Sequence, residues 1–327
     1  MGVINSVIAS IKKIDLRDQW MLGILLFLVL AFSVFGSGFL SGYNIQTIII
    51  YNTEIMLIAV GELFTIIMGN IDISVGSVLG LSGIIGSIVM REAYANNINQ
   101  LLSIILGFSA GLGTGALCGF INGALISKIK VPAFVATLGM LGIARGVVFI
   151  ITNGSPIMHL PTLLRWIGMG NIFKTIPVMF LIAIVVCLIS GFILQQTRYG
   201  RYLYMYGGSN DATIRAGVNT DKLVIKAYVF SGVLAALAGM LLCARYSIGS
   251  PVSGQGRELD AIAAVVIGGA SLYGGKGQVS KTIIGAFVIS ILRIGLVNLG
   301  IQPYWQMVAV GCILIFAVYV DQFRRGN

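Results

Sequence analysis

The chain has 327 residues, of which 57% are apolar and only 10% are charged. An ordinary soluble domain carries about 25% charged residues, and a folded chain of this length has too little interior to hide so much apolar surface. The composition therefore excludes a water-soluble protein. It predicts an all-α polytopic membrane protein in which residues 1–327 form a single transmembrane domain.

The formal net charge of +10 would suggest nucleic-acid binding in a soluble chain. Here most basic residues lie in short loops between apolar runs, and no aromatic residues alternate with them, so no nucleic-acid partner is expected. The four cysteines lie within apolar runs and form no CxxC pair. This placement indicates packing, and neither a metal site nor a disulfide is expected.

The N-terminal segment combines charged residues such as Lys12, Lys13 and Asp15 with apolar residues such as Ile4 and Val7. The apolar positions follow a helical spacing, which predicts a cytoplasmic interfacial helix over residues 1–19. No small-residue cleavage site follows this segment, so we expect the first apolar run to be a true span.

Apolar runs of about 20 residues are long enough to cross a membrane as helices. The chain contains ten such candidates, and the eighth is short and rich in glycine. That run favours a broken or re-entrant helix, which is tolerated only inside protein or beside water. The ten runs are Trp20–Leu40, Gln46–Met68, Ile73–Met90, Leu101–Ile126, Ala133–Thr152, Ile176–Gln195, Leu223–Ala244, Leu259–Tyr273, Thr282–Leu299 and Tyr304–Val320.

The distribution of lysine and arginine predicts the orientation of these spans. If the N-terminus is cytoplasmic and the spans alternate, 14 basic residues lie on the cytoplasmic side and 5 lie outside. Cytoplasmic loops of membrane proteins carry an excess of Lys and Arg. The count therefore predicts that both termini are cytoplasmic.

The fourth apolar run carries four glycines at a four-residue period, which places them on one face of a helix. They are Gly111, Gly115, Gly119 and Gly123. Small residues in this pattern let a second helix approach closely, so we assign them to helix packing. Asn122 lies beside them and is expected to face a neighbouring helix or a cavity.

Charged side chains inside apolar runs are candidates for function. Glu54 and Glu62 lie eight residues apart in the second run, and Arg145 and Arg293 lie in the fifth and ninth. One explanation is that acids and bases pair to stabilise the bundle, and for the two arginines we favour it. A proton relay through Glu54 and Glu62 is the alternative, although a relay usually has further buried acids or histidines.

A weak internal repeat is suggested by two glycine-rich turns, at 69–77 and 268–276. If spans two to five and seven to ten form the two halves, the odd offset gives them opposite topology. Such a pattern is typical of inverted-repeat transporters.

The longest loops, 196–222 inside and 153–175 outside, are too short to hold a domain. Capture of a solute and supply of energy are therefore expected on other chains. The inner loop predicts a short helix over 211–216 with an N-cap at Asn210. Such a helix suits contact with a motor domain, and an ordinary solvated loop is the equally weighted alternative.

One stretch comes close to a nucleotide-binding motif. Residues 270–277 read ASLYGGKG, but a P-loop needs Ser or Thr where Gly277 stands, and it joins a strand to a helix rather than two spans. We therefore expect no cofactor on this chain and no enzymatic activity of its own.

Four motifs in order along the chain resemble those of the permease subunits of bacterial ribose-type ABC sugar importers. The motifs read GNIDISVGS at 69–77, PAFVATLG at 132–139 followed by Arg145 and Gly146, GR at 200–201 with GGSN at 207–210 and Gly217, and ELDAIAAVVIGG at 258–269 followed by further glycines. Asn70 stands where this family usually has glycine.

The resemblance implies a membrane subunit of the bacterial inner membrane that translocates a ribose-like monosaccharide. Its implied partners are a second permease chain that shares the pathway, an extracytoplasmic sugar-binding protein, and an ABC ATPase that holds ATP and magnesium. A nucleoside, a branched-chain amino acid or a furanone signal is the alternative cargo within this class. A secondary carrier that works alone is the alternative class.

The resemblance also implies residues for each role. The loop that contacts the ATPase would use Gly208, Asn210, Asp211, Arg215 and Gly217. The solute path would use Asn70, Asp72, Ser74, Asn122, Glu258 and Asp260. The last two open the eighth span, and they serve equally well to dock the binding protein or to cap that helix.

Overall fold

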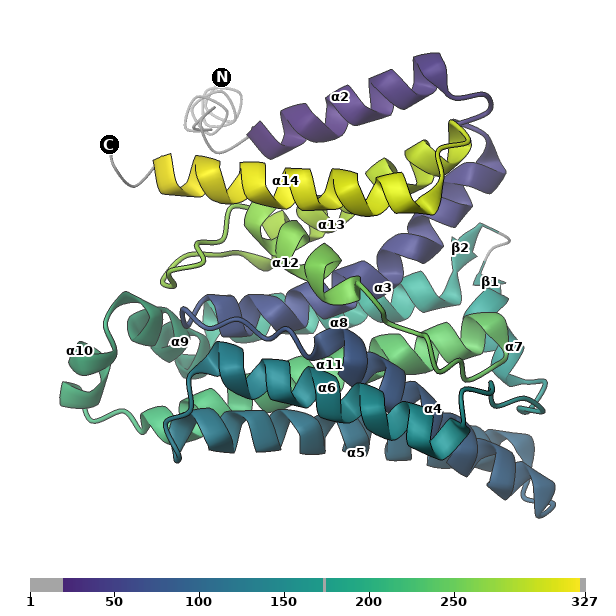
Figure 1. Cartoon of the computed structure of the whole chain (residues 1–327), viewed down its shortest axis with the longest axis horizontal. Coiled ribbons are helices and arrows are strands. Elements are labelled where there is room, and N and C mark those ends of the chain that lie inside the picture. Colours follow the sequence, from purple (N-terminus) through teal and green to yellow (C-terminus); the bar gives the residue numbers. More distant parts are fainter. Residues whose placement is uncertain (1–19, 173–174, 324–327) are drawn as a thin grey trace, which may run out of the picture.

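The computed structural model describes residues 20–172 and 175–323, so the interfacial helix predicted at 1–19 lies outside the described residues. Within them the protein is almost entirely helical (Figure 1). The elements are α2 (Trp20–Phe35), α3 (Gly42–Ile66), α4 (Val75–Ala95), α5 (Gln100–Ser127), α6 (Ala133–Thr152), α7 (Leu164–Met169), β1 (Asn171–Ile172), β2 (Ile176–Pro177), α8 (Val178–Gln196), α9 (Arg198–Gly208), α10 (Asn210–Arg215), α11 (Thr220–Tyr246), α12 (Arg257–Ile267), α13 (Val279–Asn298) and α14 (Pro303–Phe323).

The predicted all-α membrane fold is confirmed, because each of the ten apolar runs contains one long or medium helix. Seven helices within the described residues are long and apolar enough to cross a membrane: α3, α4, α5, α6, α8, α11 and α13. The apolar parts of α2 and α14 are shorter. Helix α12 has 11 residues, which at 1.5 Å per residue is roughly half of a 30 Å hydrocarbon core.

The predicted boundaries of the eighth run were wrong at its C-terminal end. The helix stops at Ile267 rather than at Tyr273, because Gly269, Gly274 and Gly275 adopt positive φ angles of 80°, 92° and 75°. Glycine reaches this region without the steric cost that other residues meet. The glycine-rich end of the run is therefore an irregular segment. This agrees with the prediction that the helix of the eighth run is broken.

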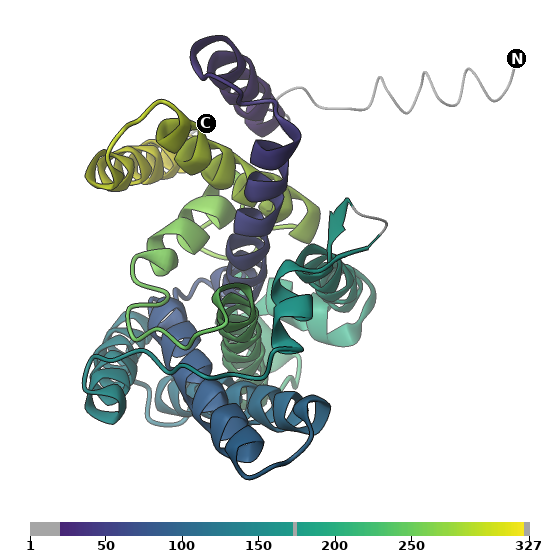
Figure 2. The ribbon, with the colours of Figure 1, turned by 90° about the vertical axis from the view of Figure 1, so that its right-hand side faces the viewer.

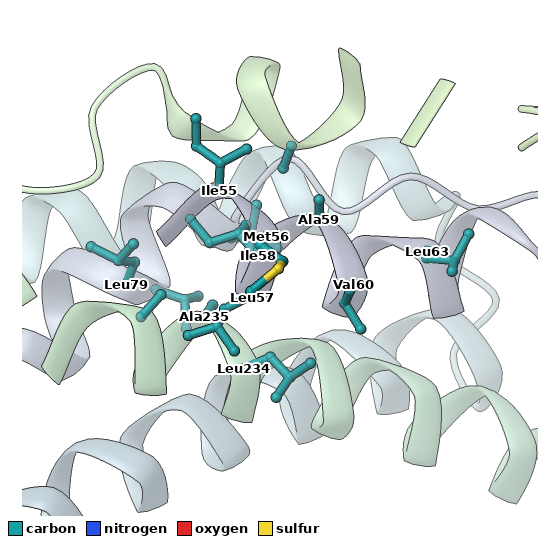
Figure 3. Close-up of a cluster of buried hydrophobic side chains, with 14 of the residues drawn as sticks. Ile55, Met56, Leu57, Ile58, Ala59, Val60, Leu63, Leu79, Leu234 and Ala235 are labelled. Carbon is teal, nitrogen blue, oxygen red and sulfur yellow. The ribbon is translucent and has the colours of Figure 1, made fainter. Parts of the chain in front are cut away.

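Helices α3 and α11 form the centre of the bundle, with the other helices around them (Figure 2). Residues 52–66 of α3 are buried on every side, as expected for a helix that is apolar all round. Figure 3 shows part of this core, in which Ile55 and Met56 of α3 lie near Leu79 of α4 and Leu234 of α11. The two central helices hold equivalent places in the predicted halves of the chain, and the inverted repeat itself stays a prediction.

The surrounding helices expose apolar side chains around the bundle. Examples are Leu26 and Leu30 of α2, Leu188 of α8 and Ile315 of α14. In water such a surface would be unfavourable, but lipid tails are as apolar as these side chains. Helices α2 and α14 lie on one side of α3 and helices α4, α5 and α6 lie on the opposite side (Figure 2).

The glycine stripe of α5 lies against α11. A Cβ added to Gly119 would lie 2.7 Å from the backbone carbon of Tyr228, and one added to Gly123 would lie 2.7 Å from the Cα of Ile225. Gly115 meets Gly232 of α11 in the same way, backbone against backbone. The stripe therefore lets α5 approach α11 more closely than any side chain would allow.

We predict that Gly119→Ala destabilises the protein by about 1–3 kcal/mol, because the new methyl group meets backbone that cannot rotate away. Gly113→Ala is the matched control, since it lies on the same helix with no atom within 4 Å of its added Cβ. Thermal unfolding of the two purified variants in detergent measures the difference. Equal melting temperatures would show that α5 and α11 are not held this closely.

Candidate functional site

Two irregular segments of backbone meet at the end of the bundle where α9 lies. One joins α3 to α4 (residues 67–74) and the other joins α12 to α13 (residues 268–278). The Gly275 N–H donates to the Ile67 carbonyl across 2.8 Å, and Gly69, at φ +76°, packs against the Tyr273 carbonyl. One hydrogen bond and this close packing therefore join the two segments.

Helix α9 contacts both irregular segments. Gly207 has no space for a side chain, because a Cβ there would lie 2.5 Å from the Gly275 nitrogen and would also meet the Ile67 carbonyl. The Tyr204 hydroxyl donates to the Gly277 carbonyl at 2.6 Å. Burial raises the pKa of this tyrosine above its ordinary value, so the hydroxyl stays a donor. Helix α9 therefore packs directly against both irregular segments.

Three of the predicted path residues come together in one buried network. One Asp72 carboxylate oxygen accepts hydrogen bonds from the Ser74 amide at 3.0 Å and the Ser74 hydroxyl at 2.5 Å. The Asn122 amide donates to that hydroxyl at 3.0 Å, and Glu62 accepts the Asp72 N–H at 2.8 Å. This network joins α3, the α3–α4 segment and α5, and its four side chains are at most 2% exposed.

Asn70, the remaining predicted path residue of this segment, is half-buried. Its backbone N–H donates to the Thr65 carbonyl at 3.1 Å, and its side-chain nitrogen has no partner among the described residues. It therefore lies nearer to the surface than Asp72 and Ser74 and outside their network.

The first turns of α4 and α12 lie side by side. Glu258 contacts the Gly76 position of α4, and Gly254 packs on the Gly76 backbone. Arg145 of α6 crosses this junction and donates to the carbonyls of Pro251 and Ser253 at 3.0 and 2.8 Å. Helix N-termini that begin inside a bundle present N–H groups and a partial positive charge to a ligand.

The junction reaches the surface along α6. Arg145 and Glu258 are half-buried, and Gln255 is exposed. Gly139, Gly142 and Gly146 of α6 are exposed, with no atom within 4 Å of an added Cβ. We call the surface formed by Arg145, Gln255, Glu258 and these three glycines the α6 polar face. It combines Arg145 and the glycines of α6 with the polar groups of Gln255 and Glu258 at the start of α12.

Asp260, the other predicted path residue of α12, is fully buried in an ion cluster away from this face. The carboxylate pairs with Arg257 at 3.1 Å and with Arg293 at 2.6 Å. Glu54 completes the cluster with Arg257 at 3.4 Å and Arg245 at 3.3 Å. These contacts show that Arg293 pairs with an acid inside the bundle, which is the explanation we favoured from the sequence. Glu54 belongs to the same cluster.

Pairing within the cluster was partly missed from sequence. Arg245 and Arg257 are two of the five basic residues that the charge count places outside the membrane. In the structure both reach into the bundle, with side chains only 18% and 19% exposed. Arg257 also stacks on the Tyr51 ring at 4.5 Å and donates to its hydroxyl. Arg145, by contrast, binds backbone carbonyls, so the pairing expected for it is replaced by a role in organising the junction.

We predict that Asp260→Ala lowers stability by about 3–5 kcal/mol, because it leaves Arg257 and Arg293 charged and unpaired inside the protein. Adding Arg293→Leu to this variant removes one of the orphaned charges and should recover part of the loss. Thermal unfolding in detergent measures both effects.

The matched control is Glu92→Ala, which breaks the exposed Arg91–Glu92 pair and should change stability by less than about 1 kcal/mol. Equal losses for Asp260→Ala and Glu92→Ala would show that the buried cluster contributes no more than a surface ion pair.

The predicted coupling loop contains two helices, α9 and α10. The short helix is present, but its N-cap is Ser209 and not Asn210. Ser209 has extended backbone angles and its hydroxyl accepts from the Ala212 N–H at 3.2 Å, whereas Asn210 is the first helical residue. Gly217 follows the helix at φ +78°. All five predicted coupling residues are exposed.

Helix α9 was not predicted. Its signal in the sequence is Thr197, whose hydroxyl caps the helix by accepting from the Gly200 N–H at 3.2 Å. Gly207, which contacts both irregular segments, was recognised only as part of the GGSN motif at 207–210. Helices α9 and α10 lie at the end of the molecule where α2 begins and α14 ends (Figure 1).

A helical bundle with irregular backbone segments at one end, polar groups beside a peripheral helix and exposed helices at that same end fits a membrane permease. A profile of the family described as "Branched-chain amino acid transport system / permease component" matches residues 44–318. The chain belongs to this family. No solved structure matches the chain.

Similar proteins confirm the resemblance drawn from the four motifs. The chain is 38% identical over 318 residues to the ribose import permease protein RbsC of Escherichia coli strain K12, and the match covers 96% of each chain. It is 34% identical to the fructose import permease protein FrcC of Rhizobium meliloti, over 92% of this chain and 84% of that one. It is 31% identical to the L-arabinose ABC transporter permease protein AraH of Azospirillum brasilense, over 94% and 87%.

Proposed function

We propose that the chain is the membrane subunit of an ABC importer that translocates a monosaccharide of the ribose type. The observation that carries this proposal is similarity over nearly the whole chain to permeases named for ribose, fructose, L-arabinose and D-allose. These solutes are neutral and rich in hydroxyl groups. The α6 polar face offers donors and acceptors of the kind that hydroxyl groups use.

A second permease chain completes the pathway in this proposal. The three open glycines of the α6 polar face recur at i, i+3 and i+7, so they lie together on one side of the helix. Small residues on an exposed face of a membrane helix favour close approach of another helix. The α6 polar faces of two chains would then enclose a passage that lipid does not reach.

The proposed orientation places α9, α10 and both termini in the cytoplasm and the chain in the bacterial inner membrane. The excess of lysine and arginine in the loops predicted to be cytoplasmic supports this orientation. An extracytoplasmic binding protein would deliver the sugar at the opposite end. The ATPase, which holds ATP and magnesium, would bind the exposed surface of α9 and α10.

The proposed energy transfer runs through α9. When the ATPase moves the α9–α10 pair, Gly207 moves against the backbone of Ile67 and Gly275 because no side chain separates them. The irregular segments have no complete helical hydrogen-bond ladder, so they deform more easily than α3 or α11. Their displacement would shift the Asp72 network and the first turn of α4, which borders the path.

Reconstitution tests the function. Proteoliposomes that contain this chain, its ATPase and its binding protein should take up radiolabelled ribose only when ATP is present on the ATPase side. Proteoliposomes with the chain alone should not accumulate ribose under a proton or sodium gradient. Gradient-driven uptake by the chain alone would refute the ABC assignment in favour of a secondary carrier.

The cargo has one specific competitor, because the family description names branched-chain amino acids. The same proteoliposomes, supplied with ribose, fructose, L-arabinose, leucine and a nucleoside in turn, distinguish the classes. We expect uptake of a monosaccharide. Uptake of leucine or the nucleoside alone would keep the transport class and refute the sugar.

We predict that Asp211→Ala combined with Arg215→Glu breaks the functional contact between the permease and its ATPase. Both side chains are exposed on α10, so the change alters the surface that the ATPase would bind without disturbing the core. ATPase stimulation and sugar uptake should fall together by at least tenfold while the permease inserts normally. Lys128→Glu is the control, since it reverses an exposed charge in another predicted cytoplasmic loop. Normal stimulation of the ATPase by the double variant would place its binding surface elsewhere.

A further inference from the structure

An apolar groove of about 580 Å³ runs between α8 and α13 on the outside of the bundle. Its walls include Ile184, Leu188 and Phe192 of α8 and Ile283 of α13, with Met56 of α3 at its floor. The groove exists because Gly191 faces it, where the nearest atoms to an added Cβ are those of Val279 at 3.8 and 4.0 Å. A larger residue at this position would fill part of the space.

The groove is aromatic at one end and polar at the other. At the aromatic end Phe180 and Phe287 pack edge to face with centroids 6.4 Å apart. At the other end lie Gln195 and Gln196. Phe180 and Gln195 are fifteen residues apart on one helix, which is roughly 22 Å. One leaflet of a 30 Å hydrocarbon core is roughly 15 Å deep, so the groove is long enough for an acyl chain.

A second cavity of about 350 Å³ adjoins the polar end and shares Gln195 with the groove. Lys276, Gln278 and Lys281 line it together with Tyr204 of α9. The two spaces together therefore offer an apolar slot that leads to a basic pocket at the end of the bundle where α9 lies.

We propose that this groove and its basic pocket bind one anionic phospholipid. The acyl chain would occupy the slot between α8 and α13, and the phosphate would lie between Lys276 and Lys281. Charge complementarity favours this occupant, because basic pockets at the cytoplasmic ends of membrane helices recognise anionic headgroups. A second copy of the chain would place Lys276 and Lys281 against an identical basic pocket, which like-charge repulsion disfavours.

The position of the pocket links lipid binding to the proposed coupling, and this step rests on the proposed function. Tyr204 lines the pocket and also donates to the Gly277 carbonyl. A bound headgroup would therefore contact both α9 and the α12–α13 segment. Anionic lipid would stiffen the connection through which the ATPase acts on the bundle, so it would change the efficiency of coupling.

Native mass spectrometry of the intact chain released from nanodiscs tests the lipid site directly. Nanodiscs of mixed phosphatidylglycerol and phosphatidylcholine should yield one retained phosphatidylglycerol per chain. Lys276→Gln with Lys281→Gln should lower this preference by about thirty-fold, at roughly 1 kcal/mol for each lysine near the headgroups. Gly191→Phe should reduce retention of both lipids, because the ring occupies the acyl slot.

Two controls separate this site from general attraction to a basic surface. Lys128→Gln with Lys226→Gln removes two exposed lysines of other predicted cytoplasmic segments and should leave retention unchanged. Size-exclusion profiles and thermal melts confirm that each variant is folded. Unchanged retention in Lys276→Gln/Lys281→Gln, or equal loss in the control pair, would overturn the proposal.

The competing occupant has its own readout. If a second copy of the chain fills the groove, Leu188→Cys on an otherwise cysteine-free background should form disulfide-linked dimers in native membranes. Such dimers would overturn the lipid assignment, and their absence together with retained phosphatidylglycerol supports it. The lipid measurement uses the chain without an ATPase, so it can succeed even if the proposed transport function fails.

Discussion

Backbone N–H and carbonyl groups inside a bilayer have no water to bond with, so every one of them must find a partner within the protein. Regular helices meet this requirement internally. The segments 67–74 and 268–278 have no complete ladder of this kind, and they lie against each other and against α9 at one end of the bundle, with Gly275 donating to Ile67. Gly207 of α9 therefore has no space for a side chain where these parts of the chain meet.

The same constraint governs the charged side chains. Glu54 and Asp260 are removed from lipid by three arginines, each of which comes from a different helix or helix end. Asp72 is removed from lipid by local hydrogen bonds and by Asn122. Arg145 is satisfied by backbone carbonyls that are available only because the segment before α12 is irregular. Irregular backbone and buried charge thus support each other.

The sequence predicted features that depend on neighbours along the chain. Helix α6 was predicted at its observed boundaries, Ala133–Thr152, from the length of its apolar run. In the structure Pro132 precedes this helix and Asn153 ends it in a left-handed conformation. The short α10 and the glycine face of α5 were also visible. The end of α12 was placed six residues too late, since glycines continue an apolar run in composition while they end the helix in conformation.

Contacts between segments far apart in the sequence could not be predicted from residue patterns. Asn122 and Ser74 are 48 positions apart, and Arg257 and Glu54 are 203 apart. No periodicity relates them, so Asp260 was grouped with Glu258 as a path residue although the two side chains point into different surroundings. Arg145 was recognised as part of a motif, but its hydrogen bonds to backbone carbonyls became known only from the structure.

The α6 polar face has an energetic consequence for a chain that stands alone in the membrane. A lone chain presents Arg145 and Glu258 near a lipid boundary, where a charged group costs at least a few kcal/mol. Covering that face with protein or with water would therefore lower the free energy of the chain in the membrane.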